Sequence, residues 1–164
     1  MSEPLQILVV GGPEPDLGLS PWGPFAVRTC ATLADAAEAL RIGPADAVLV
    51  CVDGPPALQA LQRWPALSQA VLDSAVVVSV PAPPPKPALA LLQRGVQDVL
   101  CAREASTEML ARALRLAVER KRLELAARKA YATDLATGLP NHAQLLEHMT
   151  HLLALREREP APMA

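Results

Sequence analysis

The sequence predicts an α/β fold: a doubly wound, five-stranded parallel sheet followed by a long helical extension toward the C-terminus. Three features predict it, namely short continuous runs rich in Val, helical patterns between them, and a late stretch without Pro or Gly. A continuous apolar run is typical of a parallel strand because helices bury both of its faces. Strands that alternate with helices form a doubly wound sheet, whose functional loops lie at the carboxyl ends of the strands.

Five segments are the expected strands. Residues 5–10, 47–52 and 75–80 are the clearest, and residues 25–31 and 98–101 are weaker candidates. Aromatic residues make up only 2% of the 164-residue chain, so Leu, Val and Ala must build the core. A chain of this length holds one well-buried core and an appendage, because a typical domain has about 150 residues.

Helical periodicity occupies the segments between the strands, with one exception. Apolar residues at positions 33, 36, 37 and 40 follow Thr32, which forms a capping box with Asp35. Two more helices are expected, one that begins at residues 58–62 and one at residues 88–92, before Gly95. The exception is the segment from residue 11 to residue 24, which is rich in Pro and Gly, so the first helix of the fold should be shortened, displaced or absent. A second proline cluster, residues 81–87, is expected to be a stiff, extended connector rather than a docking edge.

A long helix is expected from about Ser106 to Tyr131, since no Pro or Gly intervenes. Along it, one set of residues recurs at alternating steps of four and three, the seam spacing of a left-handed coiled coil. The seam residues are Met109, Ala113, Leu116, Arg120, Leu123, Ala127 and Ala130. Arg120 interrupts the seam and the alanines pack weakly, so an isolated helix would be marginal. We expect a parallel homodimer through this helix, stabilised partly by the preceding domains.

Charge and composition exclude several classes of partner. The formal net charge of -2, without a basic patch, argues against nucleic-acid binding. No run reaches the roughly 18 apolar residues of a membrane span and the N-terminus does not resemble a signal peptide, so a cytoplasmic chain without membrane contact is expected. Three cysteines without a CxxC pair indicate reduced, buried thiols. The three histidines lack a ligand spacing, so neither a metal nor a cofactor is expected.

Two segments carry a resemblance to the receiver domains of two-component response regulators. Residues 46–51, DAVLVC, with Pro55 four residues later, resemble the DxxxxD strand and following Pro of that family. Residues 95–100, GVQDVL, resemble the GAxDYL segment that leads into the last receiver strand. The resemblance runs from Leu5 to about Arg122 and implies a flavodoxin-like sheet. The expected pseudo-receiver domain is therefore residues 1–122, with its last helix from about residue 106.

The resemblance places the receiver phosphorylation site at four residues that lack its chemistry. In receivers an acidic pair and an acceptor Asp hold Mg²⁺, and a Lys pairs with the phosphoryl group. Here the acidic pair falls on Gly11 and Gly12, the acceptor on Cys51 and the Lys on Ala102. Aspartyl phosphorylation is therefore not expected, because these residues offer neither oxygen ligands nor charge. Asp53 is a poor substitute acceptor, since DGP is typical of a turn.

A second resemblance begins after the long helix. Residues 134–141, DLATGLPN, are similar to the DxLTGLPN opening of GGDEF diguanylate cyclase domains. It divides the rest of the chain into a helical stalk or linker, residues 123–133, and the truncated N-terminal helix of a GGDEF domain, residues 134–164. In that family the residue matching Asn141 helps to hold guanine, together with an Asp whose place is taken here by Thr150. The GGDEF signature itself does not occur, so no enzymatic activity is expected of this chain.

These expectations lead to one leading hypothesis and three alternatives. The leading hypothesis is a phosphorylation-independent pseudo-receiver that serves as a regulatory and dimerisation module in cyclic-di-GMP signalling, with an unidentified protein as a further partner. The receiver's switch aromatic corresponds to Val99 and its hydroxyl partner to Ser79, so the usual output toggle should also be lost. The alternatives are a small-molecule sensor that uses the vacated acidic pocket, a folding spacer, and a thiol redox switch at Cys51.

Overall fold

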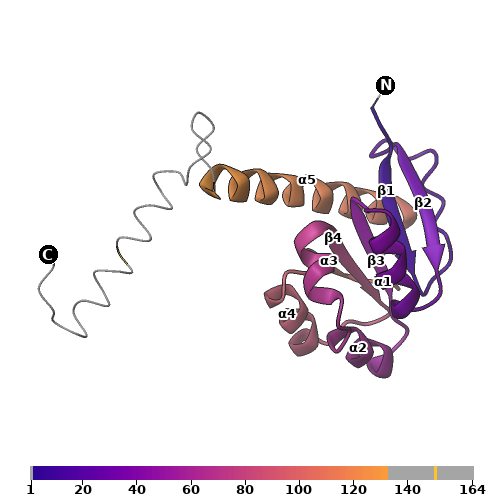
Figure 1. Ribbon diagram of the computed structural model, residues 1–164. Helices are drawn as coiled ribbons and strands as arrows, with labels where there is room; N and C mark the ends of the chain where they lie inside the picture. Colours follow the sequence, from indigo (N-terminus) through magenta and orange to yellow (C-terminus); the bar gives the residue numbers. More distant parts are fainter. Residues whose placement is uncertain (1, 133–149, 151–164) are drawn as a thin grey trace, which may run out of the picture. The chain divides into compact units, whose positions relative to one another are not determined.

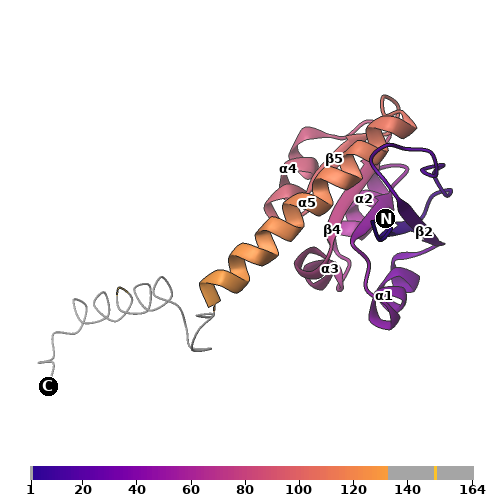
Figure 2. The ribbon, with the colours of Figure 1, turned by 90° about the horizontal axis from the view of Figure 1, so that it is seen from above.

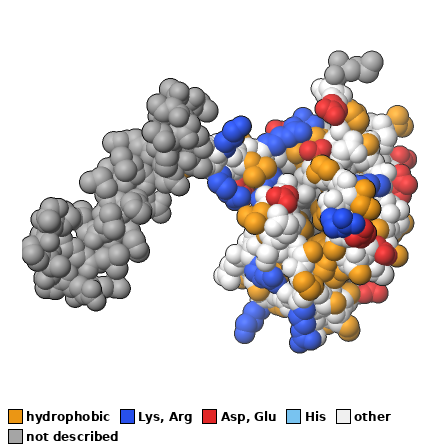
Figure 3. Space-filling model, in the orientation of Figure 1, with side chains coloured by type: hydrophobic (Ala, Val, Ile, Leu, Met, Phe, Trp, Pro, Cys, Tyr) orange, Lys and Arg blue, Asp and Glu red, His pale blue; other side chains and the backbone are white. Residues whose placement is uncertain are grey.

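The computed structural model describes residues 2–132 and residue 150, and the statements below concern those residues. The chain divides into two compact units, Met1–Lys121 and Arg122–Ala164. The first unit contains the whole sheet (Figure 1), and hydrophobic, basic and acidic side chains are interspersed on the face that Figure 3 shows. In the part of the chain that the structure describes, no helix is both long and apolar enough to cross a membrane.

Five parallel strands form a single sheet in the order β2-β1-β3-β4-β5. The strands are β1 (Leu5–Val10), β2 (Phe25–Cys30), β3 (Ala47–Cys51), β4 (Ala75–Val80) and β5 (Asp98–Cys101). The central strands carry the longest Val-rich runs, as expected of strands that helices cover on both faces. The doubly wound, five-stranded sheet predicted from the sequence is thus confirmed, with the second and third strands one residue shorter than expected.

Helices cover the two faces of the sheet unequally (Figures 1 and 2). One face carries α1 (Leu33–Ile42), α2 (Pro55–Gln62), α3 (Leu67–Asp73) and α4 (Pro85–Gln93). The other face carries α5 (Thr107–Ala132), the long helix that the sequence predicts. The capping box at the start of α1 is confirmed in part, because the Thr32 hydroxyl accepts a hydrogen bond of 3.1 Å from the backbone N–H of Asp35.

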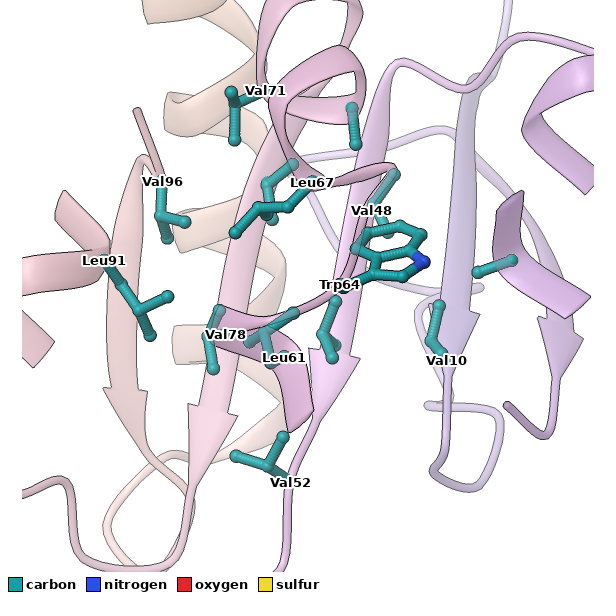
Figure 4. Close-up of a cluster of buried hydrophobic side chains, with 14 of the residues drawn as sticks. Val10, Val48, Val52, Leu61, Trp64, Leu67, Val71, Val78, Leu91 and Val96 are labelled. Atoms are coloured by element: carbon teal, nitrogen blue, oxygen red, sulfur yellow. The ribbon is translucent and has the colours of Figure 1, made fainter. Parts of the chain in front are cut away.

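Two hydrophobic cores lie on the two faces, and alternate residues of each strand enter one or the other. Val48, Val50, Val76 and Val78 enter the first core, whereas Ile7, Val9, Leu49 and Val77 enter the second. In the first core, Trp64 packs between the helices and the Val-rich strands together with Leu61 and Leu67 (Figure 4). This alternation is the geometry of a pleated strand, in which successive side chains point to opposite faces. Because β-branched residues pack well on such a surface, Val fills much of the first core and part of the second, with few aromatic residues.

The first helix of the expected fold is absent, as its composition predicts. Residues 11–24 join β1 to β2 without a helix and lie beside α5 in Figure 2. From this segment Leu17 is 3% exposed and enters the second core, with Trp22 packed against the same core. The guanidinium of Arg112 in α5 lies over the Trp22 ring, 5.8 Å from its centroid. The loop therefore replaces part of the burial that a helix would supply.

One local expectation is wrong, and one helix has no counterpart in the sequence-based predictions. That helix is α3, which has only seven residues and whose N-cap, Ala66, forms no side-chain hydrogen bond. The proline cluster at residues 81–87 is not extended throughout, since α4 begins at Pro85. Proline is well tolerated in the first turn of a helix, where its missing N–H would have had no partner.

Candidate functional site

The sheet brings three of the four predicted site residues together at the carboxyl ends of its strands. Gly11 and Gly12 follow β1, and Cys51 ends the neighbouring strand β3, which pairs with β1 through Val10 and Val50. Ala102 follows β5, with β4 between it and Cys51. Its backbone N–H donates a hydrogen bond of 2.7 Å to the carbonyl of Val80, so it extends the ladder between β4 and β5.

The Cys51 side chain fills the space beside Gly12. A Cβ atom placed on Gly12 would lie 2.6 Å from the Cys51 Sγ and 2.9 Å from its Cβ, closer than any ordinary contact. Gly11 has a φ of +76°, and a Cβ there would lie 3.0 Å from the Cys51 carbonyl oxygen. The Cys51 side chain therefore leaves no room for a side chain at Gly12, and the positive φ together with the close Cys51 carbonyl disfavours one at Gly11.

The chemistry of Cys51 does not suit a phosphoryl or magnesium site. Its thiol is partly buried, and burial raises its pKa above the ordinary value of a cysteine, so the neutral thiol predominates near pH 7. A neutral thiol neither coordinates Mg²⁺ nor stabilises a phosphoryl group. Burial also raises the pKa of Cys30, helped by the negative charge of Asp35. All three cysteines are free, as expected of reduced thiols, but each is only partly buried where the sequence predicts buried ones.

The neighbouring acidic residues do not supply the missing charge. The Asp46 carboxylate accepts a hydrogen bond of 2.7 Å from the backbone N–H of Gln6, at the amino end of the strands and hence the opposite edge of the sheet. Asp53 is exposed and lines a separate cavity that includes none of Gly11, Gly12, Cys51 and Ala102. Over the described residues, no group of three His, Cys, Asp or Glu side chains could hold a metal ion.

Comparison with known proteins gives relatives by structure alone, because no family model and no curated protein matches the sequence. The signal receiver domain of a putative LuxO repressor protein from Vibrio parahaemolyticus has a TM-score of 0.54 at 17% identity, over 76% of this chain and 98% of that domain. An atypical orphan response regulator has a TM-score of 0.55 at 20% identity, over 70% of this chain and 96% of its own. NtrX from Brucella abortus, in complex with ATP, has a TM-score of 0.59 at 18% identity, over 91% of this chain and 34% of that protein. The sheet and its helices form a receiver fold.

In this receiver fold the two residues expected at the output switch lie on neighbouring strands. Ser79 pairs with Cys51 on one side and with Leu100 on the other, and Val99 pairs with Val78. Both side chains are half-buried. The Val99 side chain packs against the first core and has no ring whose rotation could report on the site. The Ser79 hydroxyl is thus next to Cys51, not next to a carboxylate.

The predicted dimer seam lies on the part of the α5 surface that the receiver core does not use. All seven seam residues are outside the core, with Met109 56% exposed and Leu123 72% exposed. A different stripe of the helix covers the sheet, and it consists of Ala111, Leu114, Ala117, Val118 and Lys121. Beside β5, a cavity of about 330 Å³ is lined by Leu100 and by the seam residues Met109, Ala113, Leu116 and Arg120. The helix therefore presents two separate faces.

The predicted nucleotide-binding residue Asn141 and the segment 134–164, apart from Thr150, lie outside the described residues.

Replacing Gly12 with alanine tests the contact that closes the former site. Gly12→Ala is expected to lower the free energy of unfolding by about 1–3 kcal/mol, because the new methyl group meets the Cys51 side chain. Cys51→Ala removes the sulfur and should relieve part of this loss, which a double-mutant cycle in urea measures as a coupling energy. Gly18→Ala is the control, since its Cβ would approach only the Asp16 carboxylate, at 3.7 Å. A Gly12→Ala variant as stable as this control would mean that the site is open.

Proposed function

We propose that this chain is a phosphorylation-independent pseudo-receiver, which serves as a regulatory and dimerisation module of a cytoplasmic cyclic-di-GMP signalling protein. The observation that carries the proposal is the packing of the Cys51 side chain against Gly12 in a receiver fold. A receiver responds to a phosphoryl donor through its acceptor Asp and the neighbouring acidic pair. Here the Cys51 thiol occupies that space, so we infer that regulation depends on conformation or association and not on a change of charge at this site.

Two further observations support the regulatory part of the proposal. One similar structure, at 20% identity, is described as an atypical orphan response regulator with a phosphorylation-independent regulatory mechanism. In the present chain, residues 134–141 resemble the opening of GGDEF domains, and two such domains must meet to join two GTP molecules. A helix whose seam residues lie outside the receiver core, ahead of that segment, could set the geometry of such a pair. The sensor hypothesis at Gly11, Gly12, Cys51 and Ala102 is not favoured, because the Cys51 side chain fills that space.

Light scattering over a range of concentrations, with and without acetyl phosphate and Mg²⁺, tests the proposal. We expect a concentration-dependent dimer whose dissociation constant is the same in both conditions, and an intact mass without a phosphoryl adduct. Leu123→Lys places a charge in the seam and should weaken the dimer at least about tenfold, equivalent to about 1.4 kcal/mol. Leu125→Lys is the matched control, because Leu125 lies off the seam and is 37% exposed. An aspartyl phosphate, or a monomer at every concentration, would contradict the proposal.

A further inference from the structure

A second cavity lies at the carboxyl ends of β3, β4 and β5, beside the closed site. It has a volume of about 270 Å³ and is formed by the three loops that follow these strands. In open parallel sheets this edge is where ligands bind, because loops from several strands converge there. The volume is slightly below the range of about 300–1,000 Å³ that holds drug-sized ligands, so an occupant must be small.

The walls of this cavity are apolar and stiff. Leu58 is 4% exposed and Val80 is 3% exposed, and both line it together with Pro55, Pro81 and Pro84. Proline fixes its own φ angle and has no N–H, so these walls change little on binding and offer few backbone donors. A preformed cavity of this kind loses little conformational entropy when it is filled. Its selectivity must then come from the few polar groups at its rim.

Two side chains of opposite charge line the same cavity. Asp53 follows β3 and Arg103 follows β5, and both are exposed. Within residues 2–132 no ion pair or side-chain hydrogen bond joins either group to another residue, or the two to each other. The first residue of α2 and the N-cap residue of α4 also line the cavity, so the positive ends of two helix dipoles add to the Arg103 charge. The rim therefore offers one site for a cation and one for an anion.

We propose that this cavity binds a small zwitterion with a short apolar body, of the class of the aliphatic amino acids. The ammonium group of such a ligand would meet the Asp53 carboxylate, and its carboxylate would meet the Arg103 guanidinium, which suits a planar anion. The aliphatic part would cover Leu58, Val80 and the prolines. This ligand site is independent of the dimerisation proposed above, because none of the seam residues lines it.

Calorimetric titration of the full chain with L-leucine and L-valine tests the assignment. We expect saturable binding with a dissociation constant of about 1 mM or tighter. N-acetyl-L-leucine lacks the ammonium group and L-leucine amide lacks the carboxylate, and each should bind at least about tenfold more weakly. Asp53→Asn and Arg103→Gln should each weaken L-leucine binding to a similar extent. Asp16→Asn and Arg63→Gln make the same charge changes at exposed residues outside the cavity and should leave binding unchanged.

N-acetyl-L-leucine and L-leucine amide also show which charged group of the ligand contacts which side chain of the protein. Arg103→Gln should not weaken L-leucine amide further, and Asp53→Asn should not weaken N-acetyl-L-leucine further, because in each case the partner group is already missing. Amide chemical shifts should change at the non-proline residues of segments 53–58 and 80–84 and at Arg103. The proposal is overturned by an absence of saturable binding up to about 20 mM, roughly twenty times the expected dissociation constant. Binding that survives both charge variants, or shifts confined to other residues, would overturn it equally.

Discussion

Replacing Leu114 with alanine is expected to lower the free energy of unfolding by about 3–5 kcal/mol. Leu114 is fully buried in the second core, where α5 covers the sheet. Among the described residues, α5 and the loop containing Leu17 and Trp22 cover this face, and the loop takes the place of the first helix of the receiver fold. Because residues 2–132 place no second helix there to move into the space, the cavity should remain largely open, and the loss should lie toward the upper end of the range for Leu→Ala substitutions.

Leu116→Ala is the matched control, because Leu116 is the same residue type on the same helix but lies on the seam and is only half-buried. We expect it to cost clearly less stability than Leu114→Ala, about 1–2 kcal/mol, since the side chain is partly exposed and does not belong to the buried core. Its effect should appear in the dimer dissociation constant. Urea denaturation at low concentration and light scattering at high concentration separate the two effects. Equal losses of stability for the two variants would contradict the division of α5 into two faces.

Much of the fold could be predicted because its signals are local. The Val-rich runs of β1, β3 and β4 and the capping residue of α1 are each visible within a few residues. The absence of the first helix is equally local, since Pro and Gly exclude it directly. The signal for α3 is weak by comparison, because a seven-residue helix without a capping side chain is held mainly by burial of Leu67, Ala70 and Val71.

The candidate site could be predicted only as a set of residues. Sequence resemblance indicates Gly11, Gly12 and Cys51, but whether they leave a pocket depends on how β1 and β3 pair. The pairing brings the thiol against Gly12, so an apparently emptied site is in fact filled. The cavity with Asp53 and Arg103 has no sequence signature either, because these residues come from loops after different strands. Only the order of the strands brings the two charges to one rim.

Lys121→Ala is expected to lower the free energy of unfolding by about 3 kcal/mol, although the sequence places this residue in a basic run typical of a solvated surface. Lys121 is only 3% exposed, and its ammonium group donates a hydrogen bond of 2.6 Å to the carbonyl of Val71. That carbonyl lies in the last turn of α3. The backbone N–H that would continue the helical pattern, that of Ala75, donates instead to the carbonyl of Asp46. Alanine would therefore leave a cavity and a buried carbonyl that has lost this donor.

Two further variants separate these contributions. Lys121→Met keeps most of the buried volume but removes the ammonium group, with its charge and its hydrogen bond to Val71, so it should cost about 1–3 kcal/mol, the penalty of a buried acceptor that loses its donor. Lys129→Ala, an exposed residue in the last turn of the same helix, should change stability by less than about 0.5 kcal/mol. Because Lys121 joins α5 to α3, the loss should also appear as faster amide exchange in α3. If Lys121→Ala were as mild as Lys129→Ala, the ammonium group would be hydrated rather than buried, and α3 would not depend on α5.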